Sequence, residues 1–164
     1  MPRPPMPLLL SAIQPPPGRG GWHGGPTPVG ALRGVTAAQA LWAPGPQRKS
    51  IWALALHLAY WKYAVRRQLE GGERGGFPRT PSNWPAPPAR ADARQWAADV
   101  ALLKQEHELL FKAIAKFPPA RLSRRPPGGK KWTYAELITG IANHDAYHTG
   151  QIQLLKRLRA PRGG

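Results

Sequence analysis

The placement of proline constrains this chain more than any other feature of its sequence. More than half of its 21 prolines precede Gln47, and three long windows, residues 47–77, 89–117 and 128–160, contain none. Because proline in a helix interior costs about 3 kcal/mol, long helices are confined to these windows. The segment before residue 47 has room only for short helices, which we expect over residues 8–14 and, in broken form, over residues 29–43.

Each proline-free window carries a helical pattern. The first is apolar on almost every side from residue 51 to residue 61, between a candidate N-cap at Ser50 and a glycine stop at Gly71. The third opens on Thr133 and Glu136, which have the spacing of a capping box. Apolar residues of the second recur at steps of four and three, as in a bundle seam: Trp96, Val100, Leu103, His107, Leu110, Ile114 and Phe117.

No segment shows the alternation of a strand flanked by hairpin turns, so the sequence predicts an all-α fold, a four-helix bundle with a short or broken first helix. Residues 71–88 join the second and third helices. About 18 extended residues span roughly 60 Å, whereas a 20-residue helix is about 30 Å long. This connection is long enough for a crossover that makes the two helices parallel. Long loops of this kind are often lids, and Phe77 and Trp84 give this one side chains that can pack.

Composition excludes several classes of protein. The chain of 164 residues has no cysteine, so it has no disulfide framework, no thiolate metal site and no cysteine nucleophile. Its apolar runs are too short for a signal peptide or a membrane span, and we expect a cytoplasmic protein. We expect residues 1–20 to be disordered, residues 21–160 to form one domain and residues 161–164 to be a basic tail. Only eight residues are acidic, which leaves few candidates for paired-carboxylate catalysis.

The strongest chemical signal is a pair of histidines, His144 and His148, in the third window. Residues four apart share one helix face with Cβ atoms about 6 Å apart, so two imidazoles can bind one ion. His57 lies inside the most apolar helix and needs a polar partner there. Three histidines with an open position are typical of a catalytic metal site. The alternative, left open by spacing alone, is that His57 donates a hydrogen bond to a backbone carbonyl or to Tyr147.

Three further residues have weaker claims to such a site. His107 falls on the seam of its helix, and we expect a half-solvated residue at the end of the bundle and not a ligand. His23 lies in a glycine-rich loop that can reach the mouth of a site. Gln151 shares the face of His144 and His148, either as hydrogen-bonding support for a ligand or as a solvated side chain.

The motifs around these histidines resemble the DinB/YfiT-like family of metalloenzymes. The resemblance rests on residues 50–52 and 57–61, on residues 144–152, and more weakly on residues 22–24 and 34–40. It implies an up-down-down-up bundle with a long crossover between the second and third helices. It also implies a divalent metal held by His57, His144 and His148. Family members include thiol transferases and a thiol-dependent isomerase that use low-molecular-weight thiols, and dimers are common.

The leading hypothesis is therefore a metal-dependent transferase or hydrolase that acts on a small-molecule substrate, as a homodimer. The metal, Zn, Ni or Fe, would lower the pKa of a bound water or thiol, which then attacks an electrophile. A low-molecular-weight thiol is a candidate cofactor. Tyr60, Tyr147 and His23 are candidates to orient the substrate or move a proton.

Two alternatives come from other classes of protein. The net charge of +16 suggests binding of nucleic acid or another polyanion through basic runs at residues 66–67, 121–125, 130–131 and 156–162. No nucleic-acid motif accompanies these runs, and a GC-rich coding sequence alone would enrich arginine, so we expect nucleic acid not to be the partner. The other alternative is a family member that binds metal without useful catalysis.

Overall fold

A computed structural model describes residues 6–72, 75–128 and 130–159. Within these residues all regular structure is helical, which confirms the predicted all-α class. There are six α-helices and one short 3-10 helix in this part of the chain: α1 (Met6–Ile13), α2 (Pro28–Ala31), α3 (Ala37–Leu41), α4 (Ile51–Glu70), α5 (Ala93–Ala115), η1 (Pro119–Arg121) and α6 (Tyr134–Arg159).

The long helices begin and end at the residues that the sequence marks. Ser50 caps α4 by accepting a hydrogen bond from Ala53 N, and Gly71 ends it in the left-handed conformation with φ 68°. At the start of α6, Glu136 Oε2 accepts from Thr133 N at 2.7 Å while Thr133 Oγ1 accepts from Glu136 N at 3.2 Å. This reciprocal pair confirms the capping box.

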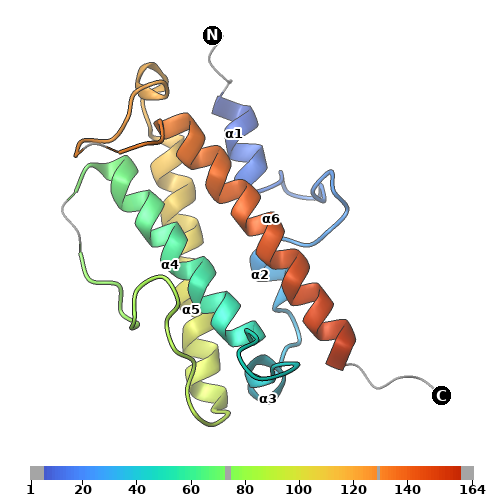
Figure 1. The fold of residues 1–164 in the computed structure, drawn as a ribbon. Helices are drawn as coiled ribbons and strands as arrows, with labels where there is room; N and C mark the ends of the chain where they lie inside the picture. The colour runs from blue at the N-terminus through green and yellow to red at the C-terminus, as the bar shows by residue number, and fades with distance from the viewer. Residues whose placement is uncertain (1–5, 73–74, 129, 160–164) are drawn as a thin grey trace.

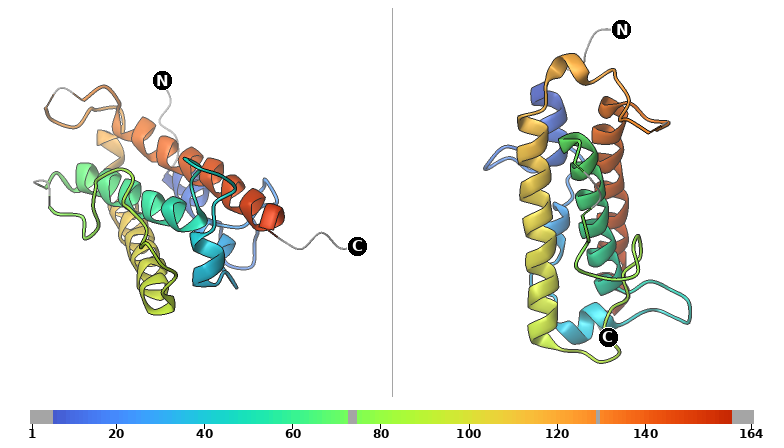
Figure 2. Two further views of the ribbon diagram at one scale, coloured as in Figure 1. Left: turned by 60° about the horizontal axis from the view of Figure 1, so that its bottom comes forward. Right: turned by 90° about the vertical axis from the view of Figure 1, so that its left-hand side faces the viewer.

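The three long helices form the bundle in the predicted order of directions (Figure 1). Helices α4 and α5 run parallel, and the connection over residues 71–92 returns along the length of the bundle to join them. Helix α6 runs antiparallel to both. The side view in Figure 2 shows the same arrangement, with α5 on one side of α4 and α6 on the other. The described part of the crossover passes along the outer side of α4.

The fourth position of the bundle is filled by α1, α2 and α3 in place of one continuous helix, as the prolines predict. Helix α1 confirms the short helix expected over residues 8–14, so the expectation of disorder over residues 1–20 is wrong for residues 6–13, while residues 1–5 lie outside the described part. Helix α1 buries Leu9 and Ile13, which are 5% and 3% exposed, against α5 and α6. These apolar side chains explain the order of α1, because burying them stabilises an otherwise marginal two-turn helix. Residues 161–164 also lie outside the described residues.

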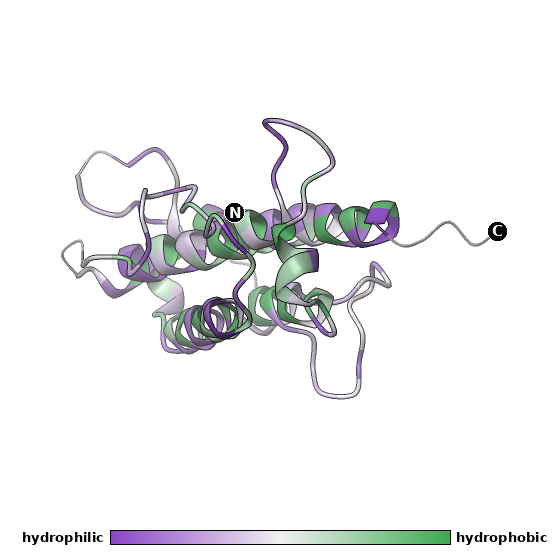
Figure 3. Cartoon of the chain, turned by 90° about the horizontal axis from the view of Figure 1, so that it is seen from below, coloured by the Kyte–Doolittle hydropathy of each residue, from purple (hydrophilic) through white to green (hydrophobic). Residues whose placement is uncertain are grey.

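Buried apolar residues form two clusters, one centred on Trp52, Leu103 and Ile152 and the other on Leu110, Ile114 and Ile138. In Figure 3 the hydrophobic colouring is concentrated on the helices, while the long loops are mostly pale or purple. Charged groups are also buried in the core. The ammonium group of Lys62, which is fully buried, pairs with Asp145 across α4 and α6. Most of the buried positions are therefore apolar, but a specific polar contact within the core also connects α4 and α6.

Candidate metal centre

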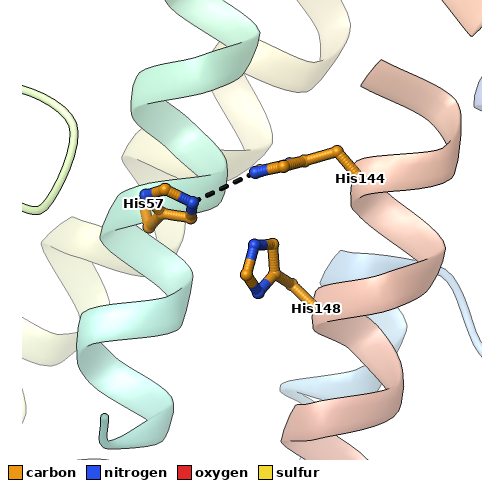
Figure 4. A group of neighbouring side chains, drawn as sticks. All are labelled: His57, His144 and His148. Carbon is orange, nitrogen blue, oxygen red and sulfur yellow. Dashed lines mark hydrogen bonds between the residues drawn. The ribbon is translucent and has the colours of Figure 1, made fainter. Parts of the chain in front are cut away.

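Three histidines meet between α4 and α6 (Figure 4). His57 projects from α4, and His144 and His148 project from successive turns of α6 into the same space. One nitrogen from each ring lies within 4.8 Å of the others, and Nε2 of His57 is 3.1 Å from Nε2 of His144. The antiparallel packing of two long helices thus brings together the three residues that the sequence singles out.

Hydrogen bonds at Nδ1 fix the direction in which two of these rings present their lone pairs. His57 Nδ1 lies 2.5 Å from the backbone oxygen of Asn83, and His148 Nδ1 lies 2.6 Å from Oε1 of Gln151. Both oxygens accept hydrogen bonds, so Nδ1 carries the proton in each ring. Each Nε2 is then unprotonated and has a lone pair that can bind a cation, and without an ion the lone pair on His57 accepts a hydrogen bond from Nε2 of His144. Hydrogen bonds of this kind commonly orient metal-binding histidines.

The crossover loop contributes to the site in a way that the sequence did not indicate. Asn83, at a left-handed φ of 70°, offers its carbonyl oxygen to His57 and its Oδ1 to the indole N–H of Trp61, at 2.8 Å. Trp84 stacks on the His57 ring with centroids 3.6 Å apart and planes 8° apart. The sequence predicts that Trp84 packs, as an aromatic side chain of the loop. The contact of Asn83 with His57 was not predicted, because it uses a backbone carbonyl, which every residue has. The tolerance of Asn for the left-handed region is its one local signal.

Burial favours the neutral form of all three imidazoles. Burial, with a smaller effect of neighbouring histidines, lowers the pKa of His57 to about 4 and that of His144 to about 3. The pKa of His148 is also lowered by burial, while its hydrogen bond to Gln151 opposes this change. All three rings are therefore neutral at pH 7, which is the state in which imidazole binds a metal.

The arrangement of these nitrogens fits a divalent metal ion. Unprotonated nitrogens that converge repel one another unless a proton or a cation lies between them. Two nitrogens bound to one zinc ion in a tetrahedral site are about 3.3 Å apart, close to the separation of the His57 and His144 Nε2 atoms. Three protein ligands leave a fourth position open for water or substrate, as in catalytic zinc sites. The donor set of three imidazoles also suits Ni or Fe.

The structure places the other candidate residues around this centre without bringing them into it. Tyr147 is exposed, and its ring meets the edge of His148 with centroids 4.9 Å apart. Tyr60 packs on Trp61 and Phe77, and Trp61 in turn contacts His57 and His144. His57 uses a backbone carbonyl and not Tyr147 as its partner at Nδ1.

The two remaining histidines lie elsewhere. His23 is in an exposed loop and lines a cavity of about 660 Å³ whose walls include none of the three clustered histidines. The expectation for His107 was half wrong. It is not part of the cluster, but it is buried at 8% exposure in the middle of α5, where its Nε2 faces Oε1 of Gln14 at 3.2 Å. It is buried because α1 and the residues after it cover this part of α5.

Several of the basic residues that suggested polyanion binding have partners within the protein. Arg66 pairs with Glu106 at 3.0 Å and with Glu70 at 2.9 Å. Lys156 donates to the backbone oxygen of Ala31 at 2.9 Å, and Arg121 donates to the hydroxyl of Tyr134 at 3.2 Å. Part of the excess positive charge therefore supports the fold.

Comparison with known protein families matches the part of the chain that carries these histidines. The sequence profile of the DinB superfamily matches residues 29–152, which is more than half of the chain and includes all three histidines. The chain belongs to the DinB superfamily. Domains of this superfamily typically bind a divalent metal. No curated protein and no solved structure matched the chain. Among the described residues of this DinB-superfamily chain, no helix is long and apolar enough to cross a membrane.

Proposed function

We propose that this chain is a metal-dependent enzyme that adds water or a low-molecular-weight thiol to a small electrophilic substrate. The observation that carries the proposal is the convergence of three neutral imidazoles, two of which are held at Nδ1 so that Nε2 points to a common centre. A divalent ion, when bound, supplies Lewis acidity that lowers the pKa of a water or thiol at its open position.

The chain's own residues would fix the geometry of such a centre and control its access to solvent. Asn83 and Gln151 hold His57 and His148 by hydrogen bonds, so little rotamer freedom is lost when an ion binds. Trp84 covers one face of His57 and Trp61 packs near His144, which limits access of water from the crossover side. Tyr147, exposed beside His148, is the residue best placed to contact a substrate that enters from solvent.

The first experiment is a metal analysis of protein purified without a histidine tag. We expect one divalent ion per chain after reconstitution with Zn, Ni or Co, measured by elemental analysis and by calorimetric titration. Single substitutions His57→Ala, His144→Ala and His148→Ala should each weaken binding at least 100-fold. His23→Ala is the matched control and should leave the stoichiometry unchanged. Absence of stoichiometric metal in the wild type would contradict the proposal.

The second experiment separates transfer from hydrolysis. The metal-loaded protein is assayed with an activated aryl halide plus a thiol, and with an activated ester in water alone. Activity in the first assay that disappears in His148→Ala supports a thiol transferase, and activity in the second supports a hydrolase. A protein that binds metal fully but accelerates neither reaction would support a family member without catalysis.

A further inference from the structure

An open groove lies beside the histidine cluster, between the C-terminal half of α4 and the N-terminal half of α6. We call it the α4–α6 groove. It has a volume of about 570 Å³, which is within the range of small-molecule sites. Its lining includes His144 itself, so the groove opens directly beside one of the three proposed ligands. The full lining is Trp61, Val65, Trp132, Ala135, Glu136, Leu137, Thr139, Gly140, Ile141, Asn143 and His144.

The groove is apolar in a strongly basic protein. The chain has 24 lysines and arginines, yet none of the described residues that line the groove is one of them. Lys131 contacts the ring of Trp132 at 4.6 Å but is not part of the lining. The single acidic residue of the lining, Glu136, is engaged in the capping box with Thr133. The described lining therefore offers an anionic ligand no positively charged partner, and its one carboxylate is already hydrogen-bonded to Thr133.

Aromatic and aliphatic surface remains available for a ligand. Trp61 already donates its indole N–H to Asn83, so what it adds to the groove is the apolar surface of its ring. Trp132 is 51% exposed, so about half of its surface is open to a ligand. Val65 and Ile141, which are almost fully buried, form part of the apolar wall.

A glycine leaves room in the groove next to the proposed metal. Gly140 precedes His144 by four residues, so it lies on the same face of α6 one turn earlier. A Cβ atom added at Gly140 would meet no other heavy atom within 4 Å. Glycine in a helix interior lowers stability by roughly 0.5–1 kcal/mol relative to alanine, so helix formation alone does not explain a glycine at position 140. Gly140 and His144 both line the groove.

We propose that the α4–α6 groove binds an uncharged, apolar and ring-sized part of the substrate and holds the electrophilic atom beside His144. The proposal deepens and rests on the proposed function, because it names the class of substrate for the same centre: a neutral aromatic or cyclic aliphatic electrophile. Thr139 and Asn143, the polar uncharged residues of the lining, orient the substrate by hydrogen bonds.

The first test uses metal-free protein and a matched pair of ligands, 2-naphthylmethanol, which is neutral, and 2-naphthoate, which is anionic. Binding is followed by calorimetry and by the fluorescence of Trp61 and Trp132. We expect the neutral ligand to bind more tightly, although a net charge of +16 alone would favour the anion. Tighter binding of naphthoate, or no binding of the neutral ligand, overturns the proposal.

Variants that fill the groove identify the binding site. Gly140→Ala should weaken binding of 2-naphthylmethanol slightly and Gly140→Leu at least tenfold. Gly150→Leu is the matched control on α6, because a Cβ atom there also meets nothing within 4 Å and Gly150 does not line the groove. Equal affinity in Gly140→Leu and wild type overturns the proposal. So does a wild-type dimer that Gly140→Leu dissociates in sedimentation experiments, since the groove would then be an interface between two copies.

The last arm separates failure of this proposal from failure of the proposed function. Protein loaded with Co²⁺ is titrated with imidazole and with 4-phenylimidazole, and the absorption of the ion is recorded. We expect both to perturb the spectrum and the phenyl group to tighten binding in wild type and Gly150→Leu but not in Gly140→Leu. Equal affinities of the two ligands overturn the groove proposal alone. Failure to bind Co²⁺ overturns the proposed function, while the naphthyl ligands still decide the groove.

Discussion

At the scale of single residues, the three histidines differ in how firmly they are held. His57 has a hydrogen bond at Nδ1 and a tryptophan stacked on its ring, and His148 has a hydrogen bond to Gln151. Nδ1 of His144 is buried and has no hydrogen-bond partner among the described residues. The ring of His144 is therefore positioned only by packing and by the hydrogen bond between its Nε2 and His57, which a bound ion would replace, so it has the most freedom to adjust to the size of that ion.

Removing the amide that holds His148 should weaken metal binding. In Gln151→Leu the His148 ring loses the acceptor that fixes its tautomer, and we expect Zn affinity to fall by about 10- to 100-fold, the range for partners of this kind. Gln153→Leu is the same change two residues later on α6, without a hydrogen bond to a histidine, and should have no effect. Calorimetric titration of both variants measures the difference. Equal affinities would show that Gln151 does not orient the ligand.

His107 should make the stability of the metal-free protein depend on pH. Burial, aided by the charge of Lys62, lowers its pKa to about 4, below the value near 6.5 of an unfolded chain. Between these two values the unfolded state binds a proton that the folded state does not. The contribution of His107 to the free energy of unfolding is therefore complete above pH 6.5 and is lost as the pH falls toward 4.

The measurement is urea unfolding at pH 7 and at pH 5. Because the clustered histidines add a dependence of the same sign, the informative quantity is the difference between wild type and His107→Leu. We expect the loss of unfolding free energy between the two pH values to be smaller by roughly 2 kcal/mol in the variant. An identical loss in both proteins would mean that the folded state does not lower the pKa of His107.

At the scale of elements, the crossover over residues 71–92 does more than connect two parallel helices. It places a carbonyl oxygen and an indole ring against His57, so its conformation and that of the site are linked. A second anchor is the ion pair of Arg79 with Asp99, whose other oxygen accepts from the indole N–H of Trp52. The loop is thus attached to α4 through Asn83 and Trp84 and to α5 through Arg79.

Shortening Trp84 should loosen this loop and weaken the metal site together. Loss of a stacked ring pair is worth about 0.5–1.5 kcal/mol, so Trp84→Ala should lower Zn affinity by about 2- to 10-fold. Cleavage by protease within residues 75–92 should become faster, and added Zn should slow it in the wild type more than in the variant. Trp22→Ala removes a fully exposed tryptophan and serves as the control. Unchanged proteolysis in Trp84→Ala would show that the loop is held elsewhere.

The sequence predicts the helices far better than it predicts the loop. Ser50, Gly71 and the Thr133–Glu136 pair mark helix ends through local hydrogen bonds, which depend on neighbouring residues alone. The approach of Asn83 to His57 depends on where a long loop lies against α4, and it uses a backbone oxygen. Because such a contact does not depend on the side chain, the sequence gives almost no sign of it. The three histidines could be found because their spacing and apolar setting are themselves sequence features.

At the scale of the whole molecule, one bundle position is assembled from three short helices. The sequence predicts a short helix near α1 but not its docking, because the prolines around it suggested disorder while Leu9 and Ile13 are the only described residues of α1 that become buried. Whether such a helix docks depends on the surface that α5 and α6 present, which is a property of the folded core. The composition of the segment alone cannot decide it.

Substituting Ile13 tests whether α1 is part of the cooperative core. Ile13 is 3% exposed, and Ile13→Ala should lower the free energy of unfolding by about 2 kcal/mol in a single transition. Leu8→Ala, on the same helix at 60% exposure, should change it by less than about 0.5 kcal/mol. Thermal and urea unfolding followed by circular dichroism compare the two. Equal, small effects would mean that α1 detaches before the bundle unfolds.

The division of one wall into α1, α2 and α3 also affects how this protein can change over evolutionary time. The proposed ligands lie on α4 and α6, whose register is set by their own packing and by the Lys62–Asp145 pair. An insertion or deletion between residues 14 and 27, or between residues 42 and 49, would alter a loop and leave that register intact. A one-residue insertion between His144 and His148 would instead rotate one imidazole by about 100° away from the other. Gains and losses of residues should therefore accumulate before residue 50, and the shape of that wall can diversify while the histidines keep their places.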